Sequence, residues 1–270
     1  MNTENRLDAR LATFVGERRP AVIPFLTAGH PDLETTARLI RRFDQLGAAA
    51  VELGFPYSDS IADGPAIQTS FHRVLARGQR VDQLLDTVAR LRQECGLPLV
   101  AMVSDSVVQR IGLERFADRA VQAGFDGLIV PDVPVEEAPR IAAVAAERKL
   151  CHIMLVATST PPARAQRIVS LCSGFVYQVA VAGTTGERSA LATDLKAHVD
   201  RLRPLTPLPV CVGFGISSPE HVRSVSGFAD GVIVGSAIVR RITQAVDAGQ
   251  TPDHIVDAIV PFVEQLVHAA

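Results

Sequence analysis

Residues 21–26 read AVIPFL and residues 49–54 read AAVELG, two short runs that are apolar at almost every position. Eight such runs occur along the chain, at Ala21–Leu26, Ala49–Gly54, Leu99–Val103, Gly127–Val130, His152–Val156, Phe175–Val181, Val210–Phe214 and Gly231–Val234. Strands that are apolar on both faces are typical of a parallel sheet covered on both sides. The sequence therefore predicts eight buried parallel strands.

Segments with helical periodicity separate these runs. One of them carries apolar residues at the i, i+3, i+4, i+7 spacing, at Val81, Leu84, Leu85, Val88 and Leu91. Ser218-Pro219 and Thr160-Pro161 have the form of helix starts, and Gly124 has that of a helix stop. Two further helices are expected outside the repeating pattern, one over roughly 6–15 before the first strand and one over roughly 252–267 at the end.

Eight strand–helix units in 270 residues fit a closed (β/α)₈ barrel, a TIM barrel, in an α/β chain. We expect one domain over residues 1–270, with an extra N-terminal helix and an inserted loop or helix after the second strand, where the gap is about 50 residues. A doubly wound open sheet is the structural alternative. It is disfavoured because no Gly-x-Gly-x-x-Gly follows the first strand.

The composition narrows the functional classes. A net charge of −2 with few clustered basic residues argues against a nucleic-acid surface. The polar start lacks the apolar core of a signal peptide, and no run has the roughly 18 apolar residues of a membrane span, so a soluble, cytoplasmic protein is expected. The four cysteines form no metal-binding pattern, and Cys151 and Cys211 are expected to be reduced and buried.

The second strand carries a lone carboxylate, Glu52, within apolar neighbours. An unpaired buried charge is costly, so Glu52 is either a general acid–base with a raised pKa or a structural glutamate bonded to backbone or to a basic side chain. Asp63 lies in the long segment that follows, where Asp63-Gly64 alone would indicate only a turn. Active sites of barrels lie at the carboxyl ends of the strands, so these two acids are candidates for separate roles at one mouth.

Glycine and hydroxyl residues follow the sixth, seventh and eighth strands, within residues 182–187, 213–217 and 235–238. Glycines allow backbone N–H groups to approach an anion, and a helix N-terminus adds a favourable dipole. Loops after strands seven and eight are the usual phosphate site of this barrel. The residues alone predict a barrel enzyme that acts on a phosphorylated small molecule with carboxylates and without a metal.

These segments resemble the tryptophan synthase alpha chain family nearly from end to end. The matching motifs are PFLTAG (24–29), ELG (52–54), SD (58–59), ADGPAIQ (62–68), DVP (132–134), GTTG (183–186), GFGIS (213–217) and GSAIV (235–239). The resemblance implies a lyase of tryptophan biosynthesis that splits indole-3-glycerol phosphate into indole and glyceraldehyde 3-phosphate by a retro-aldol reaction.

The resemblance also implies roles for individual residues. Glu52 would be the general acid–base, and Asp63 would hold the indole N–H. Thr185 would lie in a loop that closes over the site. Residues matching the phosphate cradle are Gly186, Gly213, Gly215, Gly235 and Ser236, and those matching the indole pocket walls are Phe25 and Tyr177.

The family implies no cofactor in this chain. Its expected partner is a tryptophan synthase beta chain that carries PLP, in an alpha2beta2 complex. Three places depart from the family pattern: Ser60 stands where proline is usual, Ser104-Asp105-Ser106 replaces Tyr-x-Asn, and Ala180-Val181 replaces a polar pair. The first two regions face the beta chain in the family.

Three alternatives stay open. The chain could be a stand-alone indole-3-glycerol-phosphate lyase, if the departures reflect lost coupling and not ordinary drift. It could be a non-catalytic barrel that binds the phosphate ligand and regulates a partner, although intact Glu52, Asp63 and Thr185 argue against this. It could be another phosphate-binding barrel, but those often use a lysine at a strand end, and no strand run here contains one.

Overall fold

The computed structural model describes residues 5–60, 63–180, 195–213 and 215–270. Within these ranges the strands are β1 (Ala21–Thr27), β2 (Val51–Gly54), β3 (Leu99–Met102), β4 (Gly127–Ile129), β5 (Cys151–Ile153), β6 (Leu155–Val156), β7 (Val176–Val179), β8 (Val210–Gly213) and β9 (Gly231–Val234). The described strands pair in parallel, in the order β5-β4-β3-β2-β1-β9-β8-β7-β6. The predicted parallel strands are confirmed, with bounds that shift by one or two residues.

The sheet closes on itself at its fifth strand. β5 and β6 stand at opposite ends of the strand order, yet only Met154 separates them along the chain. The carbonyl of Met154 accepts a hydrogen bond from the N–H of Tyr177 at 3.1 Å, and that of His152 accepts one from Ser173 at 2.8 Å. The single strand expected over His152–Val156 is therefore interrupted once, and the α/β architecture is the expected (β/α)₈ barrel.

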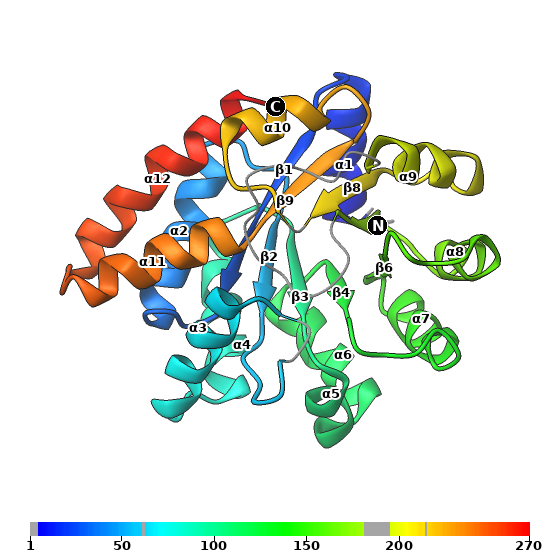
Figure 1. Ribbon diagram of the computed structural model, residues 1–270. Helices are drawn as coiled ribbons and strands as arrows, with labels where there is room; N and C mark the ends of the chain where they lie inside the picture. Colours follow the sequence, from blue (N-terminus) through cyan, green and yellow to red (C-terminus); the bar gives the residue numbers. More distant parts are fainter. Residues whose placement is uncertain (1–4, 61–62, 181–194, 214) are drawn as a thin grey trace.

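Helices surround the strands (Figure 1). They are α1 (Arg6–Gly16), α2 (Leu33–Gln45), α3 (Pro65–Ala76), α4 (Val81–Leu91), α5 (Asp105–Ile111), α6 (Leu113–Ala123), α7 (Ala138–Glu147), α8 (Pro162–Val169), α9 (Leu195–Leu202), α10 (Pro219–Val225), α11 (Ser236–Asp247) and α12 (Pro252–His268), with a short 3₁₀ turn at Arg203–Leu205. The insertion expected after the second strand is confirmed as α3, which precedes the α4 of the regular repeat. α12 packs on α2 and α11 at the outside of the barrel.

Local sequence explains where several helices begin and end. Ser218 caps α10 by accepting a hydrogen bond from the N–H of His221 at 3.3 Å, as its Ser-Pro pattern predicts. Gly124 ends α6 in the left-handed conformation, with φ 99°. The expected helix cap at Thr160 is wrong. The residue before α8 is Pro161, and the Thr160 hydroxyl instead accepts a hydrogen bond from the N–H of Ala157 at 3.0 Å.

Two apolar cores follow from the alternation of side chains along the strands. One side of each strand packs against the helices, as Val22 and Leu26 of β1 do. The other side fills the barrel interior, as Ile23 and Phe25 do. The apolar face of α1 belongs to the interior cluster, through Leu7, Leu11 and Phe14. The extra N-terminal helix therefore covers one end of the barrel.

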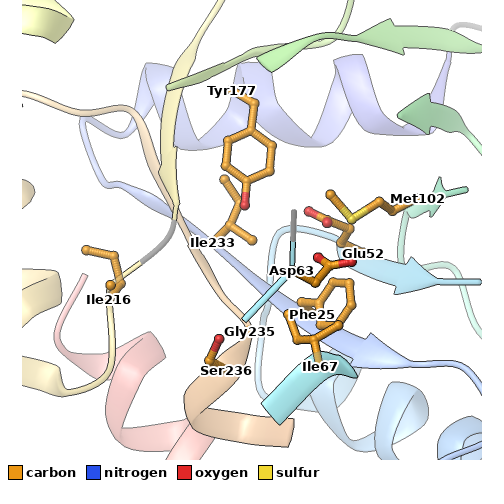
Figure 2. Close-up of a pocket in the computed structure, with 11 residues that line it drawn as sticks. Phe25, Glu52, Asp63, Ile67, Met102, Tyr177, Ile216, Ile233, Gly235 and Ser236 are labelled. Atoms are coloured by element: carbon orange, nitrogen blue, oxygen red, sulfur yellow. The ribbon is translucent and has the colours of Figure 1, made fainter. Parts of the chain in front are cut away.

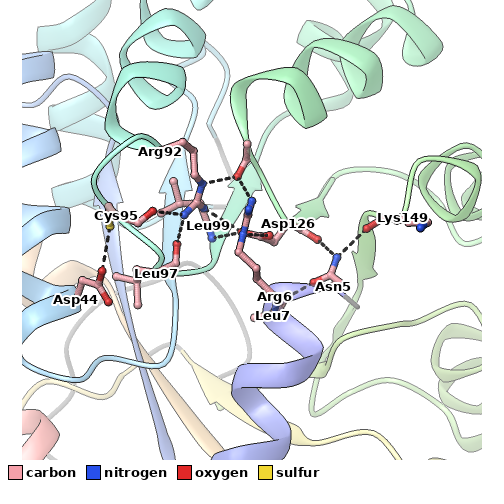
Figure 3. A network of polar contacts seen from close by, with 11 residues as sticks. Asn5, Arg6, Leu7, Asp44, Arg92, Cys95, Leu97, Leu99, Asp126 and Lys149 are labelled. Atoms are coloured by element: carbon pink, nitrogen blue, oxygen red, sulfur yellow. Dashed lines mark hydrogen bonds and ion pairs between the residues drawn. The ribbon is translucent and has the colours of Figure 1, made fainter. Parts of the chain in front are cut away.

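Polar contacts hold α1 at that end (Figure 3). Asp126 lies just before β4 and is 4% exposed. Its carboxylate accepts hydrogen bonds from Arg6 at 2.8 Å, from Arg92 at 2.9 Å and from the N–H of Leu99 at 2.9 Å. Because Leu99 begins β3, this network lies at the amino ends of the strands. The carboxyl ends are left open for a site.

Candidate active site

A pocket lies at the carboxyl ends of the strands and encloses about 430 Å³ of empty space, including its open mouth. Its lining comes from β1, β2, β3, β7, β9, the start of α3, the start of α11 and the segment after β8, and comprises Phe25, Glu52, Asp63, Ile67, Met102, Tyr177, Gly215, Ile216, Ile233, Gly235 and Ser236. Figure 2 shows the carboxyl groups of Glu52 and Asp63 close together on one side and Ser236 below them. The expectation that both acids share one barrel mouth is confirmed.

Glu52 projects into the interior from the middle of β2. It pairs in register with Phe25 of β1 and with Val100 of β3, both of which belong to the interior cluster. Its side chain is 1% exposed, and among the described residues its Oε2 has no hydrogen-bond partner. Burial, with a smaller contribution from the charge of Asp63, raises the pKa of Glu52 to about 8. The carboxyl group therefore holds its proton at neutral pH, and no basic side chain among the described residues is paired with it.

Asp63 is held from several directions at the entry to α3. Its N–H donates to the carbonyl of Ser60 at 3.0 Å, and its own carbonyl accepts from Nε2 of Gln68 at 2.6 Å. Its Oδ2 accepts from the hydroxyl of Tyr57 at 3.3 Å. Burial raises the pKa of Asp63 to about 6, while the Tyr57 hydrogen bond lowers it and the charge of Asp132 raises it. Asp63 is therefore ionised at neutral pH, where Glu52 is not.

The opposite part of the lining is suited to an anion. Gly235 precedes α11, and Ser236 is its first residue, so the first N–H groups of this helix lie at the pocket without partners inside the helix. Gly215 completes this region with φ 97°, a left-handed conformation that side chains rarely adopt. The structure thus brings three of the predicted phosphate residues together. Thr185 and Gly186 lie outside the described residues.

Gly213 is placed differently from the expectation. It is not among the residues that line the pocket, and a Cβ at this position would lie 2.6 Å from Cζ of Tyr177. The absence of a side chain at Gly213 therefore makes room for the Tyr177 ring, which faces the pocket in Figure 2. Gly213 therefore shapes the wall through Tyr177.

Apolar side chains form the remaining walls. Phe25 and Tyr177 lie where the indole pocket was expected, and both are 3% exposed. Sequence reasoning missed four further wall residues: Ile67, Met102, Ile216 and Ile233. The sequence could have predicted Ile233 and Met102, because period-2 alternation places them on the interior side of β9 and β3. The sequence offers no such pattern for Ile67 beyond its position in the ADGPAIQ motif, because its place in the wall depends on how α3 packs.

Groups that could bind a metal are not gathered in this part of the molecule. The described residues contain no cluster of three or more histidine, cysteine, aspartate or glutamate side chains with metal-binding geometry. The four cysteines are free thiols, and Cys151 and Cys211 are buried as expected. In the described part of the chain, no helix has the length and apolar character that crossing a bilayer requires.

These features define a class, the (β/α)₈-barrel enzymes. In this one the pocket contains a protonated and an ionised carboxyl group, and the N-terminus of α11 beside them is suited to bind an anion. Comparison with known proteins is more specific. The profile of the family described as tryptophan synthase alpha chain matches residues 11–267. Tryptophan synthase alpha chains of Rhodopirellula baltica and Gloeobacter violaceus are 46% and 42% identical to this chain, over 87% and 98% of it and over 86% and 95% of their own lengths.

Solved structures agree with the sequence relatives. The crystal structure of tryptophan synthase subunit alpha from Legionella pneumophila superposes with a TM-score of 0.90 at 33% identity, covering 99% of this chain and 98% of the other. A structure of tryptophan synthase from Mycobacterium tuberculosis gives a TM-score of 0.88 at 31% identity, covering 99% and 98%. The chain belongs to the tryptophan synthase alpha chain family.

Proposed function

We propose that this chain is a carbon–carbon lyase that cleaves indole-3-glycerol phosphate into indole and glyceraldehyde 3-phosphate. The observation that carries the proposal is the joint placement of Glu52 and Asp63 in one pocket, with the N-terminus of α11 in the same lining. An ionised and a protonated carboxyl group beside an anion cradle suit a substrate with a basic ring carbon, an N–H group and a phosphate.

The protonation states suggest the order of proton transfers. Glu52, which holds its proton at neutral pH, would donate it to C3 of the indole ring. The ring then carries positive charge at its N–H, which the carboxylate of Asp63 would stabilise. Glu52, now a carboxylate, would take the proton of the hydroxyl on the adjoining glycerol carbon as the carbon–carbon bond breaks. That carbon becomes the aldehyde, the bond electrons return to the ring, and Glu52 regains its proton.

Binding would hold the two ends of the substrate apart. The phosphate would lie against Gly215, Gly235 and Ser236, with Gly186 joining them and Thr185 closing over the site as the family pattern implies. The indole would lie between Phe25 and Tyr177. Gly213 would shape the indole wall through Tyr177.

A beta chain is the partner that family membership suggests, in an alpha2beta2 complex in which PLP belongs to the beta chain and this chain needs no cofactor. The exposed Ser58 and Asp59 keep the family motif at the same loop. Ser60 and Ser104, two departures from the pattern, are buried, and Ser104 donates to Oδ2 of Asp132 at 2.7 Å. Because the side chains of Ser60 and Ser104 are buried, their drift is no argument for a stand-alone lyase, whereas Ser106 of the same departure is exposed. Free thiols fit a cytoplasmic enzyme.

The test is to incubate purified protein with indole-3-glycerol phosphate and to measure indole. Glu52→Gln and Asp63→Asn should each lower kcat/KM by at least ~10², the usual contribution of a positioned acid or base. Glu264→Gln, which changes an exposed acid on α12, should leave the rate unchanged. Near-normal rates in both site variants, or no indole from the wild type with and without a beta chain, would refute the proposal.

The pH profile of the same reaction is a second readout. The rate constant kcat/KM should rise as pH passes about 6, where Asp63 ionises, and fall as pH passes about 8, where Glu52 loses its proton. The substrate phosphate also titrates near ~6. Asp63→Asn separates the two contributions, because it retains the phosphate and removes the carboxyl group.

A further inference from the structure

Tyr57 lies beside the pocket without lining it. It is partly buried in the segment between β2 and α3, and its ring packs against Phe71 of α3 with centroids 5.5 Å apart and planes tilted by 54°. Its hydroxyl donates to Oδ2 of Asp63 at 3.3 Å. A phenylalanine would supply the same ring packing, so the hydroxyl has no packing role.

The main chain of Asp63 is already fixed by other groups. Gln68 donates to the carbonyls of Ser60 and Asp63, at 3.0 and 2.6 Å, which ties the loop to the first turn of α3. These bonds place the Cα of Asp63 but leave its carboxylate free to rotate. Among the described residues, the Tyr57 hydroxyl is the donor that fixes the carboxylate itself.

The electrostatic surroundings of Asp63 explain why the hydrogen bond from Tyr57 affects its protonation. Asp132 is anchored nearby, accepting from the Ser104 hydroxyl at 2.7 Å and from the N–H of Asp105 at 2.8 Å. Burial and the charge of Asp132 both raise the pKa of Asp63, and among the described residues the Tyr57 hydrogen bond lowers it. Burial and the charge of Asp63 in turn raise the pKa of the Tyr57 phenol, so it stays a donor at any working pH.

We propose that Tyr57 is a positioning residue for the lyase reaction, whose hydroxyl keeps the Asp63 carboxylate ionised and aimed at the indole N–H. The inference rests on the proposed function for its kinetic consequence. Its physical content, a hydrogen bond that stabilises one charged carboxylate, can be measured without turnover.

The deciding variant is Tyr57→Phe, which removes one oxygen and keeps the ring on Phe71. A hydrogen bond to a charged group is lost, so kcat for indole release should fall about tenfold, with KM changing by less than about twofold. In the Asp63→Asn background the same change should have little further effect, because the two residues act as a unit. Phe71→Leu is the packing control. It disturbs the ring contact and leaves the hydroxyl in place.

A carbon-13 NMR titration of the Asp63 carboxyl group, assigned with Asp63→Asn, provides the readout that needs no activity. The pKa of Asp63 should be higher in Tyr57→Phe than in the wild type and unchanged in Phe71→Leu. An unchanged pKa in Tyr57→Phe, or an equal rise in Phe71→Leu, would overturn the inference. If the wild type releases no indole, the proposed function fails, and the titration still decides whether Tyr57 controls Asp63.

Discussion

At the scale of single residues, Glu52 combines full burial at β2 with an oxygen, Oε2, that has no partner among the described residues. An unfolded chain releases the proton of a glutamate near pH 4.5, whereas the folded chain holds that of Glu52 up to about pH 8. Between these values the folded state binds a proton that the unfolded state has lost. The contribution of this residue to the free energy of unfolding therefore falls as pH rises through this window.

Glu52→Gln should accordingly stabilise the protein in a pH-dependent way. The amide does not titrate, so its advantage over the wild type should be smallest near pH 4.5, grow as pH rises, and level off above about 8, at up to a few kcal/mol. Urea unfolding at about pH 5 and about pH 9 measures it, with Glu264→Gln as the exposed control. An advantage that is the same at both pH values would show that the buried carboxyl group is not the cause. The wild-type carboxyl group thus lowers stability in exchange for the proposed activity, a trade-off that active sites commonly show.

At the scale of elements, the strands fill the barrel by placing glycines opposite large side chains. Gly213 of β8 faces Tyr177 of β7, and Gly54 of β2 faces Phe25 of β1. In each pair the large partner lines the pocket and the glycine does not. Because each glycine lacks a side chain, it leaves the space on its strand that the ring of the neighbouring strand occupies.

Gly213→Ala tests this arrangement. The added methyl group cannot coexist with the present Tyr177 ring, which must shift into the pocket or out of it. We expect kcat/KM to fall about tenfold or more, because small displacements at a site are costly. Gly227→Ala, where a Cβ meets nothing within 4 Å, is the control and should be neutral. A Gly213→Ala enzyme with wild-type kinetics would mean that Tyr177 has no part in binding.

At the scale of the whole molecule, the two ends of the barrel have separate tasks. The site occupies the carboxyl ends of the strands, while α1 and the Asp126 network cover the amino ends (Figure 3). Arg92 has an 11% exposed side chain and donates to the carbonyls of Gly124, Cys95 and Leu97 as well as to Asp126. The network joins α1 to the starts of β3 and β4, and none of its residues is among those that line the pocket.

Asp126→Ala should therefore lower stability without lowering activity. Removing one partner of a buried ion pair leaves Arg92 uncompensated and should cost about 3 kcal/mol. Glu114→Ala breaks the Arg140 pair, whose side chains are 60% and 53% exposed, and should cost far less. Urea unfolding measures both losses, and indole release below the unfolding transition should stay close to wild type. Equal losses in the two variants would contradict a structural role for the network.

The sequence alone determined the repeating architecture. Apolar runs at eight places were enough to predict a parallel barrel, because a strand covered on both faces must be apolar at consecutive positions. The same pattern marked Glu52, since a carboxylate in such a run is conspicuous, and the family motifs marked Asp63, Gly215, Gly235 and Ser236. Helix ends were predicted where a single residue decides them, as at Ser218 and Gly124.

Tertiary structure alone decided which side chains meet. The interruption at Met154, the fit of Tyr177 against Gly213 and the hydrogen bond from Tyr57 to Asp63 all depend on strand register and on how α3 packs beside β1. Periodicity along one strand says which side a residue takes, but not which atom of another element lies opposite. The protonation states of Glu52 and Asp63 belong to the same category, because burial and neighbouring charges exist only once the barrel has closed.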